Sequence, residues 1–343
     1  MQVFTCAACG QPLYFENFVC LGCNAPLGFI PDQGVLGTLR QDRPDRFTPF
    51  GTPAPVLRRC GNAEAGYCNW MVPEAGPDLC TACALNRTIP DLTPENRARW
   101  QEVETARRRL VYALLRLRLP VDPDRLGFDV LAERPSAPPV MTGHAEGLVT
   151  LALVEADPAE REKRREEMGE PYRSLVGHLR HEIGHFYWDL LVRDGGRLEE
   201  ARQVFGDERA DYATALERDY QDGPPAAWAE THVSTYATSH PWEDFAETWA
   251  HCLHIIDTLD TAQSFRIVVA PQGGTAAELE PGFDAYAESD MERLIALWLP
   301  LTYAVNSLNR SMGQPDLYPF VLSPAVIAKL GFVRRLIAGA GLG

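Results

Sequence analysis

The apolar positions in the middle of the chain are spaced as in an amphipathic helix. Between residues 174 and 192 they recur at steps of three or four, which is the spacing of one helical face. They are Leu175, Leu179, Ile183, Tyr187 and Leu190/Leu191. Asp194-Gly195-Gly196 follows as a stop signal. The pattern therefore predicts one helix over residues 174–192.

Similar signals place the other elements. Three helix starts are marked by a Ser or Thr shortly ahead of a proline, because the hydroxyl can cap the helix and proline is tolerated in its first turn. Helices are expected from Thr93 to about Leu119, from Ser239 onward, over residues 290–309 with a bend at Pro300, and over residues 323–337. Strands are expected over residues 126–131 and 147–154. This mixture predicts an α+β fold, in a chain whose 343 residues allow two or three domains.

Cysteines set the amino-terminal quarter apart, since eight of the nine lie before residue 84. The first four form two Cys-x-x-Cys knuckles, a pattern that arranges four thiolates around zinc with a small hairpin between them. The next four are less regular, but they end in a third knuckle and lie among turn residues. The expected ligands are Cys6, Cys9, Cys20 and Cys23 for one structural zinc, and Cys60, Cys68, Cys80 and Cys83 for another. We expect a zinc-ribbon region over residues 1–90.

Two alternatives remain for these cysteines. Disulfides could link the first set, although a reducing cytoplasm disfavours them. The second set could consist of buried or unpaired thiols. Both predicted zinc sites are closed, so neither is expected to be catalytic. Zinc ribbons often present a surface to a protein partner, which is the main non-enzymatic hypothesis for this region.

The predicted helix over residues 174–192 carries a His-Glu-x-x-His sequence. His181 and His185 are four residues apart, so a helix presents both imidazoles on one face to one metal ion. Glu182 lies next to them and can take a proton from metal-bound water. The alternative is that these residues share a helix by accident. His178, one turn earlier, is interpreted as a supporting or surface histidine.

A catalytic zinc needs a third protein ligand and one open position for water. Glu243 and Glu247 are one helical turn apart, so one carboxylate can bind metal while the other accepts the free N–H of a ligating histidine. Glu208 competes with Glu243 from residues 206–213, which also look helical and acidic; the alternative for Glu208 is a solvated helix face. His251 and His254 are weaker candidates for the same position.

The sequence resembles known peptidase families at these motifs. His181-Glu182-Ile183-Gly184-His185 followed by Glu243-Asp-Phe-Ala-Glu247 resembles the gluzincins, zinc peptidases whose third ligand is a later glutamate. Tyr236, seven residues before Glu243, resembles the tyrosine that stabilises the tetrahedral intermediate in enzymes of the anthrax lethal factor type. Together with the zinc ribbon and the segment Gly206-Asp-Glu-Arg-Ala-Asp-Tyr212, most of the chain resembles the bacterial "putative zinc-binding metallopeptidase" family. The resemblance implies a zincin-like metallopeptidase domain, expected over residues 91–343.

Charge limits the classes of partner. The net charge of −15 and the pI near 5.0 argue against nonspecific binding to nucleic acid or an anionic membrane. One basic patch stands out within residues 93–119, and we interpret it as a solvated face or a docking surface for the acidic domain. Its members are Arg107, Arg108, Arg109, Arg116 and Arg118. The start of the chain has no basic segment before an apolar run, and no stretch approaches 18 apolar residues, so a cytoplasmic protein is expected.

These observations predict a zinc metallopeptidase with one catalytic and two structural zincs per chain. Zinc held by His181, His185 and Glu243 would activate a water molecule, Glu182 would accept its proton, and Glu247 would orient a ligating histidine. On the resemblance, Tyr236 would stabilise the oxyanion. The expected substrate is a peptide or protein. A non-catalytic adaptor acting through the ribbons is the alternative, and a nucleic-acid-linked regulator is a third class.

Overall fold

The structure, a computed structural model, divides the chain into two units. One comprises residues 1–142 and 147–158, and the other comprises residues 143–146 and 159–343. The residues described are 2–51, 55–64, 66–134, 138–167, 172–273, 277–280 and 282–341. Helices and strands are both present, as the α+β prediction requires. The boundary near residue 90 between a ribbon and a peptidase domain stays a prediction.

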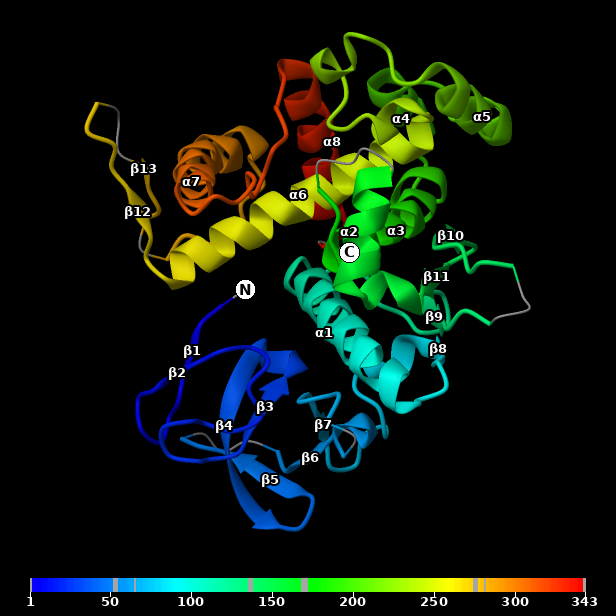
Figure 1. Ribbon diagram of the computed structural model, residues 1–343. Coiled ribbons are helices and arrows are strands. Elements are labelled where there is room, and N and C mark those ends of the chain that lie inside the picture. The colour runs from blue at the N-terminus through cyan, green and yellow to red at the C-terminus, as the bar shows by residue number, and fades with distance from the viewer. Residues whose placement is uncertain are drawn as a thin grey trace. The chain divides into compact units, whose positions relative to one another are not determined.

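The first unit begins with short strands. Its elements are β1 (Phe4–Thr5), β2 (Pro12–Leu13), β3 (Leu27–Ile30), β4 (Val35–Arg43), β5 (Arg46–Pro49), β6 (Leu57–Arg59), β7 (Met71–Pro73), β8 (Asn86–Thr88), α1 (Pro94–Arg116), β9 (Gly127–Leu131) and β11 (Leu148–Ala152). Strands β3 to β7 form one antiparallel sheet, while β8 and β11 pair in parallel with β9 (Figure 1). The two strands and the first helix predicted from sequence are thus confirmed.

The antiparallel sheet is held by a small apolar core and by one close approach of backbone. Side chains from its strands form the core, namely Ile30, Leu39, Phe47, Leu57 and Met71. Gly28 lies beneath Met71, where a Cβ would come within 2.4 Å of the thioether sulfur. Any larger residue at position 28 would therefore displace Met71 from the core.

Helix α1 contacts the cysteine-rich segment through aromatic rings. Tyr112 lies 5.2 Å from Phe15 and 5.7 Å from Phe29 between ring centroids, and Phe29 in turn lies 4.7 Å from Trp70. All four rings are buried, and edge-on aromatic pairs such as the two that Tyr112 makes add stability beyond the area that they bury. The helix and the cysteine-rich segment therefore share one core.

The interpretation of the α1 arginines as a solvated basic patch is wrong for two of them. Arg107 is fully buried and forms an ion pair with Glu104, with Nη2 lying 2.7 Å from each carboxylate oxygen. Arg108 is also buried, and its guanidinium donates to the backbone carbonyl of Tyr67. Arg109 remains 45% exposed, paired with Glu16. The charge pattern along the chain did not reveal these buried partners.

The second unit is mainly helical. Its elements are β10 (Gly143–Ala145), α2 (Pro158–Glu167), α3 (Leu175–Tyr187), a π-helical segment (Trp188–Arg193), α4 (Leu198–Phe205), α5 (Tyr212–Asp222), α6 (Pro241–Ser264), β12 (Val268–Val269), β13 (Ala277–Glu278), α7 (Met291–Ser311) and α8 (Pro324–Ala340). The long helix α6 crosses α3 and also contacts α7 and α8 (Figure 1). The helices predicted near residues 174, 290 and 323 are confirmed.

Two helix starts differ from the prediction. His240, rather than Ser239, caps α6 by accepting a hydrogen bond from the backbone N–H of Trp242. The segment over residues 206–211 forms turns instead of a helix, and α5 begins only at Tyr212, with the Asp211 side chain as its cap. The cap of α6 thus lies one residue later than predicted, and α5 begins several residues later than predicted. In each helix the side chain of the capping residue accepts a hydrogen bond from a free backbone N–H of the first turn.

Candidate metal centre

The two histidines of α3 converge with a glutamate from the first turn of α6. One ligand atom each from His181, His185 and Glu243 lies within 4.8 Å of the other two. Glu243 Oε2 is 2.9 Å from His181 Nε2 and 3.5 Å from His185 Nε2. Residues four apart on α3 supply the imidazoles because they share one helical face. The arrangement brings together the three residues that the sequence selected.

The chemistry of this set fits a zinc ion. Glu243 Oε2 is buried, and no well-aligned hydrogen-bond donor reaches it among the residues that the structure describes. Burial alone would raise the pKa of the Glu243 carboxyl, but His181 and His185 hold that pKa well below its usual range. Two imidazoles and one ionised carboxylate are the protein ligands of many catalytic zinc sites. A cation at this point would satisfy the buried oxygen.

Glu247 and Ser234 hold His181 in place. Glu247 Oε1 lies 2.7 Å from His181 Nδ1, and the Ser234 hydroxyl donates to Glu247 Oε2 at 2.6 Å. Burial disfavours the charged form of Glu247, yet the contact with His181 lowers its pKa to about 2. The carboxylate is thus positioned to accept the Nδ1 proton, which leaves Nε2 free for a metal. Ser234 had no recognisable signal in the sequence.

Glu182 and Tyr236 lie beside this cluster. Glu182 is 9% exposed, and burial raises the pKa of its carboxyl, although the neighbouring imidazoles oppose that shift. The Tyr236 ring is 5.8 Å from the His181 ring between centroids. Burial raises the pKa of the Tyr236 hydroxyl, so it remains a proton donor. A raised pKa makes the Glu182 carboxylate a stronger proton acceptor, and the protonated Tyr236 hydroxyl can donate a hydrogen bond.

The competing ligand candidates have other partners. Glu208 forms a two-point ion pair with Arg202, at 2.5 and 2.9 Å. His251 Nδ1 lies 2.6 Å from the Tyr318 hydroxyl, and His254 Nδ1 lies 2.5 Å from an Arg180 nitrogen. Neither histidine, nor Glu208, is in the ligand cluster formed by the described residues. The geometry favours Glu243 as the third ligand.

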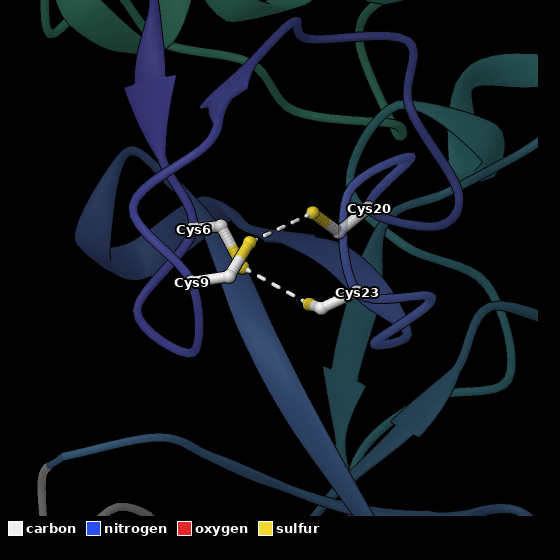
Figure 2. A group of neighbouring side chains, drawn as sticks. All are labelled: Cys6, Cys9, Cys20 and Cys23. Atoms are coloured by element: carbon white, nitrogen blue, oxygen red, sulfur yellow. Dashed lines mark hydrogen bonds between the residues drawn. The ribbon is translucent and has the colours of Figure 1, made fainter.

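The eight amino-terminal cysteines form two tetrads. In the first, Cys6 and Cys23 sulfurs are 3.7 Å apart, and Cys9 and Cys20 sulfurs are 3.6 Å apart (Figure 2). A disulfide would require about 2.05 Å. Four sulfurs at about 2.3 Å from a tetrahedral zinc would be about 3.8 Å from one another, close to these distances. The thiols are free of disulfides, so the disulfide alternative does not hold.

The second tetrad has the same geometry in a deeper setting. Its Cys68 and Cys80 sulfurs are 3.7 Å apart, and the four ligand atoms lie within 4.8 Å of one another. All four residues of the tetrad are buried, whereas Cys9 and Cys23 of the first tetrad are exposed. Backbone N–H groups of Trp70 and Cys83 point at sulfurs of this set. Donation of this kind stabilises thiolates, so the tetrad suits zinc better than neutral thiols.

Comparison with known proteins agrees with this geometry. The family described as "Putative zinc-binding metallo-peptidase" matches residues 96–336. The chain belongs to this family. A zinc-ribbon domain matches residues 3–94, which contain both cysteine tetrads. The metallopeptidase match contains His181, His185 and Glu243.

Relatives of this chain occur in mycobacteria. An uncharacterised protein of Mycobacterium bovis and one of Mycobacterium tuberculosis are each 41% identical to it over 348 residues, covering 98% of this chain and 95% of theirs. No solved structure matches the chain significantly. Among the described residues, no helix is both long enough and apolar enough to cross a membrane.

Gly184 allows α3 and α6 to approach closely. A Cβ at this position would lie 3.0 Å from the Ala246 Cα and 3.2 Å from the Trp249 Cβ. We expect Gly184→Ala to lower the free energy of unfolding by about 1–3 kcal/mol, because the two backbones must separate. Chemical denaturation would measure the loss. Gly339→Ala, on α8 with open space at its Cβ, is the control and should leave stability unchanged or slightly higher; equal effects would contradict the close-approach argument.

Proposed function

We propose that this protein is a zinc-dependent peptidase of the gluzincin type, which hydrolyses peptide bonds by means of a metal-activated water. His181, His185 and Glu243 are the proposed zinc ligands. The observation that carries the proposal is the convergence of their ligand atoms within 4.8 Å, with Glu182 next to them on α3. Membership of a zinc-binding metallopeptidase family supports the same reaction class.

The surrounding residues have distinct proposed roles. Zinc bound here would lower the pKa of a coordinated water to about 7. Glu182 accepts the proton of the attacking water and later delivers it to the leaving amine. Tyr236 donates its hydroxyl hydrogen to the oxyanion that forms from the peptide carbonyl. Glu247 keeps His181 in the tautomer that presents Nε2 to the metal, since it accepts from Nδ1.

The two cysteine tetrads are the proposed structural zinc sites, which gives three zincs per chain. Cys6, Cys9, Cys20 and Cys23 bind one of them, and Cys60, Cys68, Cys80 and Cys83 bind another. Free thiols are required for this chemistry, so a reducing compartment such as the cytoplasm is the proposed location. We also propose that residues 1–90 form the ribbon region and residues 91–343 the peptidase domain.

Zinc content tests the proposal directly. Elemental mass spectrometry of the purified protein should find about three zincs per chain in the wild type and about two in His181→Ala. His178→Ala is the matched control, since His178 lies one turn away on α3 but outside the ligand cluster, and it should keep three. Two zincs in both the wild type and His181→Ala would contradict the catalytic site.

The ribbon also supports a second candidate, a zinc-binding adaptor without catalysis. Three apolar side chains near the first tetrad are exposed, with Leu21 at 87%, Tyr14 at 52% and Val19 at 40%. A contiguous exposed apolar patch favours contact with a protein partner, and these three side chains are the candidates for one. An adaptor would retain three zincs but hydrolyse nothing, so turnover on a peptide library separates the two candidates.

A further inference from the structure

A tyrosine outside the predicted site contacts the proposed metal ligand. Tyr212 is the first residue of α5, and its hydroxyl donates to Glu243 Oε1 at 2.6 Å. Asp211 fixes the start of that helix, because its side chain accepts from the backbone N–H of Thr214 at 2.8 Å. The sequence suggested that residues 206–212 supply a metal ligand, Glu208. The segment instead supplies the Tyr212 hydroxyl, which contacts the proposed ligand Glu243.

The contact is reinforced by the backbone and by neighbouring rings. His240, the cap of α6, has its Nε2 3.1 Å from the carbonyl oxygen of Ala210. The Tyr212 ring lies edge-on to His240 at 5.2 Å and to Trp242 at 5.9 Å between centroids. The turn before α5 is thus joined to the first turn of α6, which carries Glu243. Tyr212 is held in this position by more than one hydrogen bond.

Tyr212 makes the two oxygens of Glu243 unequal. Oε1 accepts the phenol hydrogen bond, while Oε2 lies 2.9 Å from His181 Nε2 and 3.5 Å from His185 Nε2. A hydrogen bond to an ionised carboxylate is among the stronger kinds, so rotation of the carboxylate has a clear energetic cost. Only Oε2 is then directed at the point where the three ligands meet.

We propose that Tyr212 is a positioning residue that makes Glu243 a ligand through one oxygen only. The inference rests on the proposed function. If both oxygens of Glu243 bound the zinc, the second would compete for the position that the reacting water needs. By occupying Oε1, Tyr212 keeps that position open. Tyr212 acts on the reaction through Glu243, whereas Tyr236 is the residue proposed to contact the oxyanion.

Cobalt substitution tests this role without relying on activity. Tyr212→Phe removes only the hydroxyl and keeps the ring contacts with His240 and Trp242. The labile metal of the full-length protein would be removed with a chelator and replaced by one equivalent of Co²⁺. Subtracting the visible absorption of His181→Ala isolates the contribution of the proposed catalytic site. Tyr220→Phe is the matched control, because Tyr220 lies on the same helix and is 73% exposed.

We expect the wild type and Tyr220→Phe to give the intense absorption of four-coordinate cobalt. Tyr212→Phe should give weaker, shifted bands, since a second Glu243 oxygen raises the coordination number. It should also bind zinc roughly 10- to 100-fold more weakly in competition with a chelator, as other losses of a ligand's hydrogen-bond partner do. An unchanged spectrum in Tyr212→Phe would overturn the role of Tyr212 but leave the proposed function intact. A wild type that gives no difference from His181→Ala would instead contradict the proposed function.

Discussion

Glu182→Gln is expected to abolish hydrolysis while the protein keeps its zinc. The amide has nearly the shape of the carboxylate but cannot accept a proton, and a positioned general base contributes roughly 100- to 10,000-fold to rate. Glu182 is not in the ligand cluster, so its replacement should leave zinc content at the wild-type value. Turnover of a peptide library and elemental analysis of the same sample would measure both quantities.

The design separates the base from the metal site. His181→Ala should lose both zinc and turnover, whereas Glu182→Gln should lose turnover alone. Glu208→Gln is the matched control, because Glu208 is paired with Arg202 outside the cluster and should retain activity. Normal turnover by Glu182→Gln would remove this residue from the mechanism. Inactivity of the wild type with three zincs bound would favour the adaptor.

The sequence predicted the part of the site that depends on local periodicity. His181 and His185 are four residues apart on a single helix, so their common face follows from helical geometry alone, and Glu182 is the next residue after His181. Glu243 followed from its spacing to Glu247 and from the resemblance, and the structure places its carboxylate between the two imidazoles. These inferences needed no knowledge of how the helices pack.

The residues that support the site were not predictable in the same way. Ser234 and Tyr212 contact Glu247 and Glu243 across 13 and 31 positions of sequence. Serine and tyrosine are common residues, and Ser234 and Tyr212 stand at no characteristic spacing from the glutamates that they contact. Only the tertiary arrangement brings these groups together. Tyr212 lay within a segment that was considered as a source of a metal ligand, but the residue considered there was the acidic Glu208. The Arg202 side chain that neutralises Glu208 could not be inferred from spacing.

Helix α1 gives a second example, in which the missed partners are charges. Glu104 stands one turn before Arg107, a spacing that favours an ion pair on a helix surface. The structure places this pair in the interior, with both side chains fully buried. The Arg107 guanidinium also donates to the carbonyl of Ala82, inside the knuckle between Cys80 and Cys83. The spacing is typical of a surface ion pair, but here the buried Arg107 joins α1 to the backbone of the second tetrad.

Loss of this link should destabilise the first unit strongly. We expect Arg107→Met to lower the free energy of unfolding by about 3–5 kcal/mol, because the buried Glu104 carboxylate loses its close ion pair and keeps only the Arg108 guanidinium, 4.0 Å away. Arg109→Met is the control: Arg109 is 45% exposed and paired with Glu16, and such surface pairs contribute about 0–1 kcal/mol. Urea unfolding followed by tryptophan fluorescence would compare the two variants with the wild type.

The same substitution should affect zinc retention at the second tetrad. Cys83 Sγ lies 4.0 Å from Glu104 Oε2, so a carboxylate that has lost its close counter-ion would lie beside a cluster of thiolates. Arg107→Met should therefore release zinc to a chelator faster than Arg109→Met does. Adding Glu104→Gln should restore part of both losses, because it removes the buried charge that has lost its close partner. Equal zinc release from the two single variants would mean that α1 and the second tetrad are energetically independent, although they share one unit.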